Sequence, residues 1–199
     1  MLTLKSWTGL FHRGTEDVYP TFKVRAPRDY FERADAFLED IVYTSQEDLN
    51  GINKTFLVKL LFDNFMDHVR KGKDLFTYML QLRSKFGGIV SSSNANSPLT
   101  GRTSSGSVPG FQWGLSFQSS SHDRASYLTL NVRLHPAEVN RMRVFFDDLQ
   151  WKHHQSLNME LHELLSLLFI EFITELRNGL TEETKEEIVA AIIHKWEER

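Results

Sequence analysis

The chain has 199 residues, of which 41% are hydrophobic, and a formal net charge of -3. This length and composition suit one large domain or two small ones with a sizeable core. The absence of cysteine excludes disulfides, thiolate metal sites and a cysteine nucleophile. The net charge gives no overall attraction to nucleic acid, so such a role requires a local basic surface.

The sequence also argues against a membrane protein. The longest apolar stretch runs from Leu164 to Ile173 and contains Ser166 and Glu171. It falls far short of the roughly 20 residues that span a bilayer. The first residues lack the basic-then-apolar pattern of a secretory signal. We therefore expect a cytoplasmic protein with no membrane partner.

The first predicted element is a strand at residues 21–25, where polar and apolar residues alternate. Its apolar face carries Phe22 and Val24. Pro27 then stops the strand and suits the first turn of a helix. The opposite face of the strand is polar and carries Thr21, Lys23 and Arg25.

Three helices are predicted to follow this strand. The first is amphipathic, because Phe31, Ala34, Leu38 and Ile41 recur at three- and four-residue steps. A polar loop with a turn signal at Asn50-Gly51 precedes the second. The second helix is apolar on more than one face, with Phe56, Leu57, Leu60, Leu61, Phe62, Phe65 and Met66. The third spans residues 74–86, and Met79 and Leu82 supply its packing face.

A stretch rich in serine, glycine and asparagine, residues 87–110, comes next. Such a composition cannot bury enough apolar surface to order itself, so we predict a flexible linker. As a random coil it reaches roughly 25–30 Å, enough for the segments on its two sides to pack face to face.

Beyond the linker the pattern recurs. Residues 129–133 repeat residues 21–25 at a shift of 108, and Leu167-Leu168-Phe169 repeats Leu60-Leu61-Phe62 at a shift of 107. Order and spacing are kept over about 50 residues. The segment from Trp7 to Phe11 also resembles the one from Trp113 to Phe117.

The second copy predicts the same elements. Pro136 precedes a helix with Val139, Met142, Phe146 and Leu149 on one face. Its second helix is even more apolar, so both second helices must be buried against each other. A last helix at residues 183–198 has a capping box formed by Thr184 and Glu187. Its packing residues are Ile188, Ala191, Ile192 and Trp196.

Strand, helix, loop and buried helix follow in the order of the ribbon-helix-helix family, the Arc and MetJ type of repressor. Residues 20–28, Pro-Thr-Phe-Lys-Val-Arg-Ala-Pro-Arg, resemble its strand and helix entry, and residues 50–53 resemble its loop. The resemblance covers roughly residues 20–71 and 128–178. It implies a mainly α fold with a short antiparallel β-ribbon, in which two fused units form a tandem ribbon-helix-helix pseudo-dimer.

This resemblance implies a domain organisation. Residues 1–86 form the first repeat with an N-terminal arm and an extra helix. Residues 87–110 form the linker, and residues 111–199 form the second repeat with a C-terminal helix.

The resemblance also implies that a two-stranded ribbon enters the major groove of double-stranded DNA. The outward side chains then read base edges, since Arg and Lys donate to guanine, Asn pairs with adenine, and Thr contacts bases or the thymine methyl. The residues expected in this role are Thr21, Lys23, Arg25, Thr129, Asn131 and Arg133.

Phosphate contacts are expected at Arg28 and at the start of each second helix, where free amides and the helix dipole favour an anion. The residues are Asn53 as a cap with Lys54 in the first copy, and Asn158 as a cap in the second. Glu160 follows Asn158 closely and would repel a phosphate. Asymmetric DNA contacts are therefore expected.

Two function classes remain open. The first is a sequence-specific DNA-binding protein, whether a transcriptional repressor, a plasmid partition factor or a relaxosome accessory factor of conjugation, with self-association on the DNA. The second is a protein-interaction module, antitoxin-like or an adaptor, that keeps the fold without specific DNA binding. No catalytic motif, cofactor signature or metal-ligand spacing is recognised, and His153, His154 and His162 are interpreted as solvated.

Overall fold

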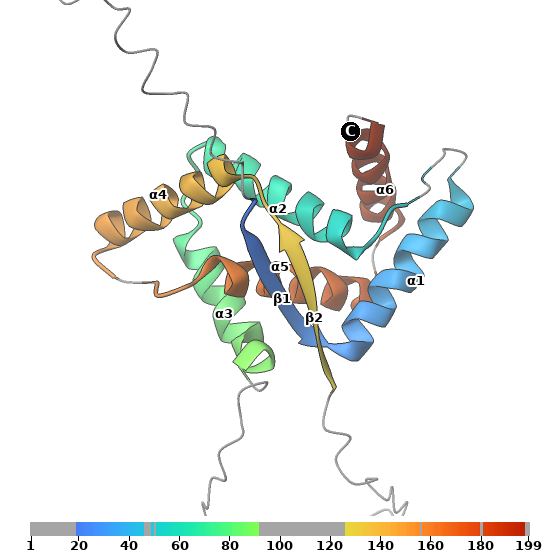
Figure 1. The fold of residues 1–199 in the computed structure, drawn as a ribbon, viewed down its shortest axis with the longest axis horizontal. Coiled ribbons are helices and arrows are strands. Elements are labelled where there is room, and N and C mark those ends of the chain that lie inside the picture. The colour runs from blue at the N-terminus through green and yellow to red at the C-terminus, as the bar shows by residue number, and fades with distance from the viewer. Residues whose placement is uncertain are drawn as a thin grey trace, which may run out of the picture.

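The computed structural model describes residues 19–45, 49, 51–91, 126–155, 157–179 and 181–197. The order strand, helix, helix, helix occurs twice along the chain (Figure 1). The bounds in the first half are β1 (Thr21–Pro27), α1 (Arg28–Thr44), α2 (Lys54–Arg70) and α3 (Phe76–Ser91). Those in the second half are β2 (Tyr127–Arg133), α4 (Pro136–His153), α5 (Leu161–Asn178) and α6 (Glu182–Glu197).

Both segments form strands, as their alternating patterns predict, and the two strands pair as an antiparallel two-stranded sheet, which the family resemblance implies. Lys23 pairs with Asn131, which lies 108 positions later, at the matching position of the internal repeat. Strand β2 begins at Tyr127, two residues before the predicted start. Figure 1 shows this ribbon lying across α5, and β1 contacts α5 while β2 contacts α2.

The centre of the core lies between the two second helices. Helices α2 and α5 pack against each other, as their apolar sequences predict, and Phe62 and Phe169 are fully buried. Phe169 also stacks on Phe31 of α1, with ring centroids 5.0 Å apart. Elements that are about 100 residues apart in the chain thus share one apolar interior.

The first helices of the two halves begin differently. Pro27 occupies the N-cap position of α1, with no side-chain cap, rather than the first turn. Pro136 is the first residue of α4, and the preceding His135 forms a capping box with Glu138. The four predicted apolar residues of α1 are all buried, whereas Met142 and Leu149 alone are buried in α4.

The third helices differ from the prediction at their ends. Helix α3 continues to Ser91, so residues 87–91, expected in the linker, are helical. Ile89 and Val90 pack against the core, and this contact stabilises the extra turn. Helix α6 begins at Glu182, and Thr181 Oγ1 accepts a hydrogen bond from the Thr184 amide at 3.3 Å. The capping box predicted at Thr184 is therefore wrong, because the helix starts one turn earlier.

Several expectations lie outside the described residues. They are the Trp7 and Trp113 segments, the linker from residue 92 to 110, and Asn50 of the turn. Gly51 of that turn has a φ of 93°, which a residue without a Cβ adopts at little cost. Within the described part of the chain, every helix is too short or too polar to cross a membrane.

Candidate nucleic-acid interface

The six residues predicted to read bases lie on one face of the ribbon. Side chains alternate across a strand, and the opposite face carries the fully buried Val24, Ala26 and Val132. Arg25 is half-buried and the other five are exposed. The register brings the six together as three cross-strand pairs, Thr21 with Arg133, Lys23 with Asn131, and Arg25 with Thr129.

This face of the ribbon is basic although the whole chain is acidic. The two strands contain Lys23, Arg25 and Arg133 and no acidic residue, against a net charge of -3 for the chain. A local positive surface of this kind is what an acidic chain needs in order to approach phosphate.

A buried serine fixes the ribbon to the helix beneath it. Ser166 of α5 is 1% exposed, and its hydroxyl accepts a hydrogen bond from the Arg25 amide at 3.0 Å. The same hydroxyl donates to the His162 carbonyl at 2.7 Å. The backbone amide of Arg25 in β1 therefore has a hydrogen-bond acceptor inside the protein. Ser166 interrupts the apolar run from Leu164 to Ile173, and a polar residue in such a run was the sequence signal for its role.

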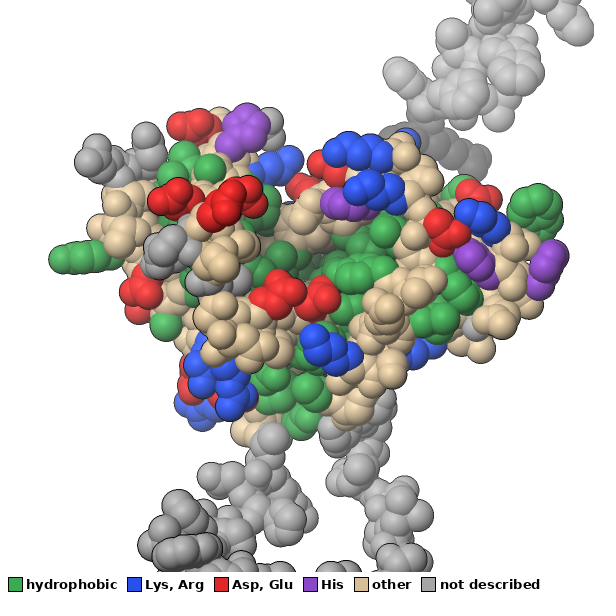
Figure 2. All heavy atoms as spheres, turned by 180° about the vertical axis from the view of Figure 1, so that it is seen from behind, with side chains coloured by type: hydrophobic (Ala, Val, Ile, Leu, Met, Phe, Trp, Pro, Cys, Tyr) green, Lys and Arg blue, Asp and Glu red, His purple; other side chains and the backbone are tan. Residues whose placement is uncertain are grey.

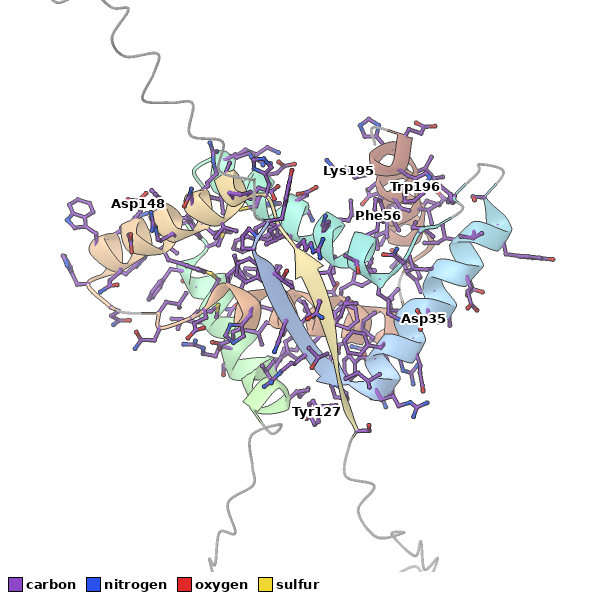
Figure 3. The ribbon with its side chains drawn as sticks, in the orientation of Figure 1. Asp35, Phe56, Tyr127, Asp148, Lys195 and Trp196 are labelled. Atoms are coloured by element: carbon purple, nitrogen blue, oxygen red, sulfur yellow. The ribbon has the colours of Figure 1, made fainter. Side chains whose placement is uncertain are left out.

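The amino end of α2 is an incomplete version of the predicted phosphate site. Asn53 caps the helix, and its side chain accepts a hydrogen bond from the Phe56 amide at 3.1 Å. Lys54 Nζ, however, lies 2.6 Å from both carboxylate oxygens of Asp35 on α1 (Figure 3). The positive charge of Lys54, which was expected to attract a phosphate, is already neutralised by Asp35. The groups left at this helix start that could bind an anion are backbone amides.

The amino end of α5 differs from the prediction. Glu160 is its N-cap residue and makes no side-chain cap bond, so the assignment of Asn158 as the cap is wrong. Asn158 instead has a φ of 42°, a left-handed conformation that Asn tolerates, between the buried Leu157 and Met159. Burial of both neighbours forces the chain to turn at this position.

Arg83 of α3 holds this turn in place. Its guanidinium donates to the carbonyls of Leu157 and Asn158 and pairs with Glu163 of α5 at 2.7 Å. The start of α5 is therefore occupied by protein groups and by the carboxylate of Glu160.

Arg28 lies at the junction of β1 and α1. Its Nε atom is 2.7 Å from Glu32, and both side chains are more than 60% exposed. An exposed pair of this type contributes little to stability, so the guanidinium can exchange Glu32 for a phosphate. The phosphate contact expected of Arg28 stays a prediction, as does that of Asn53, whose side-chain amide also donates to the Gly51 carbonyl at 3.2 Å.

The three histidines of the second half that were predicted to be solvated lie in separate surroundings. His153 Nε2 is 2.8 Å from Asp74 and its ring stacks on Phe76. His162 Nδ1 is 3.1 Å from Glu160, and His154 is exposed. Within the described residues, no three His, Asp or Glu side chains are grouped to hold a metal ion.

Comparisons of the chain with protein-family models, curated proteins and solved structures found no match.

Proposed function

We propose that the chain is a tandem ribbon-helix-helix protein that binds double-stranded DNA by placing its ribbon in the major groove. The observation that carries this proposal is the ribbon register. A fused pair of equivalent strands should pair about a two-fold centre, and the Lys23–Asn131 pair joins equivalent positions of the repeat.

The neighbouring pairs support the same centre. Thr21 and Thr129 are equivalent in the repeat, as are Arg25 and Arg133. The register exchanges them, since Thr21 faces Arg133 and Arg25 faces Thr129. A two-fold axis through the middle pair requires this exchange, and a ribbon shifted by one residue would not produce it.

The chemistry of the exposed face suits direct reading of bases. The major groove is roughly 12 Å wide and admits a two-stranded ribbon. Arg25 and Arg133 can each donate two hydrogen bonds to a guanine, and Asn131 can pair with an adenine. Each good bidentate contact contributes roughly 1–3 kcal/mol of discrimination. Because Lys23 faces Asn131 rather than another Lys, the preferred site is an imperfect palindrome.

The two halves should hold the DNA backbone unequally. Arg28 and the backbone amides of the first turn of α2 that Asn53 does not cap provide positive groups in the first half. Glu160 places a carboxylate at the matching end of α5 in the second half. A phosphate gains from the helix dipole at α2 but meets charge repulsion at α5. We expect a footprint that is stronger on one half-site.

The decisive experiment selects preferred duplexes from a random pool and then measures affinity across a salt series. We expect a clear preferred site and a linear fall of log affinity with log salt concentration. The double variant Arg25→Ala with Arg133→Ala should fold normally and lose the preference.

The matched control is Arg70→Ala with Arg177→Ala, an equivalent pair at the far ends of α2 and α5. It should keep the preference. Unchanged selectivity in the ribbon variant would remove the assignment of the ribbon as the reading surface.

Repression, partition and assistance to a relaxosome all fit such a DNA reader. The second candidate is a protein-interaction module, favoured by the net acidity and by Glu160. No binding to any duplex at about 50 mM salt would favour it, because phosphate contacts are strongest at low salt.

A further inference from the structure

A groove of about 1080 Å³ lies between α2, α3, α5 and α6. The ribbon crosses the front of α5 in Figure 1, whereas the view from behind in Figure 2 shows a hollow floored by hydrophobic side chains. Helices α2 and α5 form the floor of the groove, and α3 and α6 form its walls. The floor and walls include Leu60, Leu61, Leu168, Phe172, Leu75 and Ile188.

The groove is open because the two third helices pack differently. Helix α3 lies on α5 and buries Phe76, Met79, Leu82 and Phe86. Among the described side chains of α6, Ile192 alone is buried. Among the described elements, helix α6 therefore leaves a groove along α2 and α5, in which Leu60 and Leu61 stay partly exposed. Leu168 and Phe172 are buried side chains of its floor, each 7% exposed.

The contacts of α6 place it along the first two-thirds of α2. Trp196 meets Phe56 edge-on with ring centroids 5.3 Å apart, and Lys195 Nζ is 3.3 Å from Asp63 (Figure 3). Phe56 belongs to a small cluster with Ile41, Leu49 and Ile192 that is separate from the main core. These contacts fix α6 as one wall of the groove.

The charges around the groove are mostly negative. Five carboxylates and two lysines line it, so its net charge is 2 - 5 = -3 with histidine neutral. Two of these carboxylates are already paired, Asp63 with Lys195 and Asp67 with Arg70. Within the described residues the carboxylates of Glu175 and Glu187 have no hydrogen-bond or ion-pair partner. The carboxylates are Asp63, Asp67, Glu171, Glu175 and Glu187, and the lysines are Lys73 and Lys195.

One of these carboxylates is held at the floor of the groove. Tyr78 of α3 donates a hydrogen bond to Glu171 of α5. Burial raises the pKa of the Glu171 carboxyl above its usual range. A cation brought close to Glu171 would offset this burial cost, which makes the position receptive to Lys or Arg.

We propose that this groove binds a basic amphipathic helix of a partner protein. Its leucines and phenylalanine match the apolar stripe of such a helix, and its unpaired carboxylates match the Lys and Arg residues that border the stripe. The site is independent of the proposed ribbon function, so either can fail alone. Together they make the chain an adaptor with DNA on one face and a protein on the other.

The negative charge argues against other occupants. Nucleic acid and anionic lipid headgroups would both be repelled by the carboxylates. A small ligand is usually oriented by a few convergent polar groups in a pocket, whereas these five carboxylates come from three different helices around the groove.

The test uses the full chain and a fluorescent 15-residue probe peptide. The probe has Leu at steps of three and four residues in turn, which places all the Leu residues on one face of a helix, and it has Lys at every other position. A peptide of the same composition with the Leu residues out of phase is one control, and a peptide with Glu in place of Lys is the other. Fluorescence anisotropy should show saturable binding of the probe and little binding of either control.

Charge-reversal variants locate the site. Glu175→Lys with Glu187→Lys should weaken probe binding roughly tenfold or more, because like charges then face each other. Glu39→Lys with Asp147→Lys, at exposed positions of α1 and α4, should change it by about twofold at most. Equal loss in both variants, or equal binding of the out-of-phase peptide, would overturn the proposal.

Two further measurements distinguish the other occupants. A synthetic peptide of residues 1–14, which contains Lys5 and Arg13, is added as a competitor. The mass of the chain in solution is measured with and without probe. Displacement of the probe by the peptide, or a dimer that dissociates as the probe binds, would show that the groove serves this chain itself and overturn the assignment to a partner.

Discussion

The two halves of the molecule have the same element order but differ in what they bury. The second helices α2 and α5 both contribute fully buried phenylalanines, Phe62 and Phe169, at equivalent positions. The third helices differ, since α3 covers α5 while α6 leaves a groove beside α2. Positions in the common interior are constrained by both halves, and peripheral positions are free to diverge.

The same contrast holds for the groups beneath the ribbon. Ser166 of α5 bonds the edge of β1, and the position 107 residues earlier is Lys59 of α2. Asn53 caps α2, whereas the N-cap residue of α5 is Glu160. Equivalent positions of the two halves therefore carry unequal chemistry, and each difference can be tested by paired substitutions.

The largest effect is expected at the common core. Phe62→Ala and Phe169→Ala should each lower the free energy of unfolding by roughly 3–5 kcal/mol, because each leaves a cavity that the other half cannot fill. Urea unfolding should show one cooperative transition in both. Val144→Ala, at a position that is 55% exposed, is the control and should change stability by less than about 0.5 kcal/mol. Two separate transitions would mean that the halves fold independently.

Ser166→Ala should have the next largest effect. It leaves the Arg25 amide without its acceptor in a buried place, at a cost of roughly 1–3 kcal/mol. Amide hydrogen exchange at Arg25 should accelerate accordingly. Lys59→Ala at the equivalent position should cost less than about 0.5 kcal/mol. Similar losses of stability from Ser166→Ala and Lys59→Ala would contradict the unequal support of the two strands.

The helix caps provide a third comparison. Asn53→Ala should lower stability by about 1 kcal/mol, because the Phe56 amide loses its acceptor. Glu160→Asn should raise stability by up to about 1 kcal/mol, because Glu160 forms no side-chain cap bond. Thermal unfolding at neutral pH measures both. On the proposed function, Glu160→Asn should also strengthen binding to duplex DNA, and weaker binding would contradict the repulsion assigned to Glu160.

The smallest effect concerns the link between α3 and α4. Lys152 at 2.7 Å, the Phe76 amide and His153 together lower the pKa of Asp74 to about 2. A carboxyl with a lowered folded pKa stabilises the fold above its unfolded pKa of roughly 3.9. That contribution is lost as the pH falls from about 4 to about 2.

Asp74→Ala should therefore cost roughly 1 kcal/mol or less near neutral pH, where the native carboxylate is exposed. Its melting temperature should approach that of the native protein as the pH falls through this window. Asp147→Ala, an exposed residue of α4, is the control. A difference between Asp74→Ala and the native protein that stays constant with pH would contradict the proposed charge interaction.

Local sequence patterns predicted much of this fold. The period-two alternation at residues 21–25 and 129–133 identified both strands and their polar faces, because successive side chains of a strand point in opposite directions. The apolar residues of α2 and α5 required a common interior, because each helix is apolar on more than one face and must bury those faces against other elements. These features depend on neighbours in the chain, so the sequence alone determined them.

Tertiary packing decided the rest. Asp35 of α1 neutralises Lys54 of α2. Arg83 of α3 bonds Glu163 of α5, which lies 80 positions later in the chain. The position of α6, and the groove beside it, follow from contacts such as Trp196 with Phe56. Such contacts join side chains that are distant in sequence, and their energies arise only after the helices have been brought together. No period or local motif in the chain could therefore have predicted them.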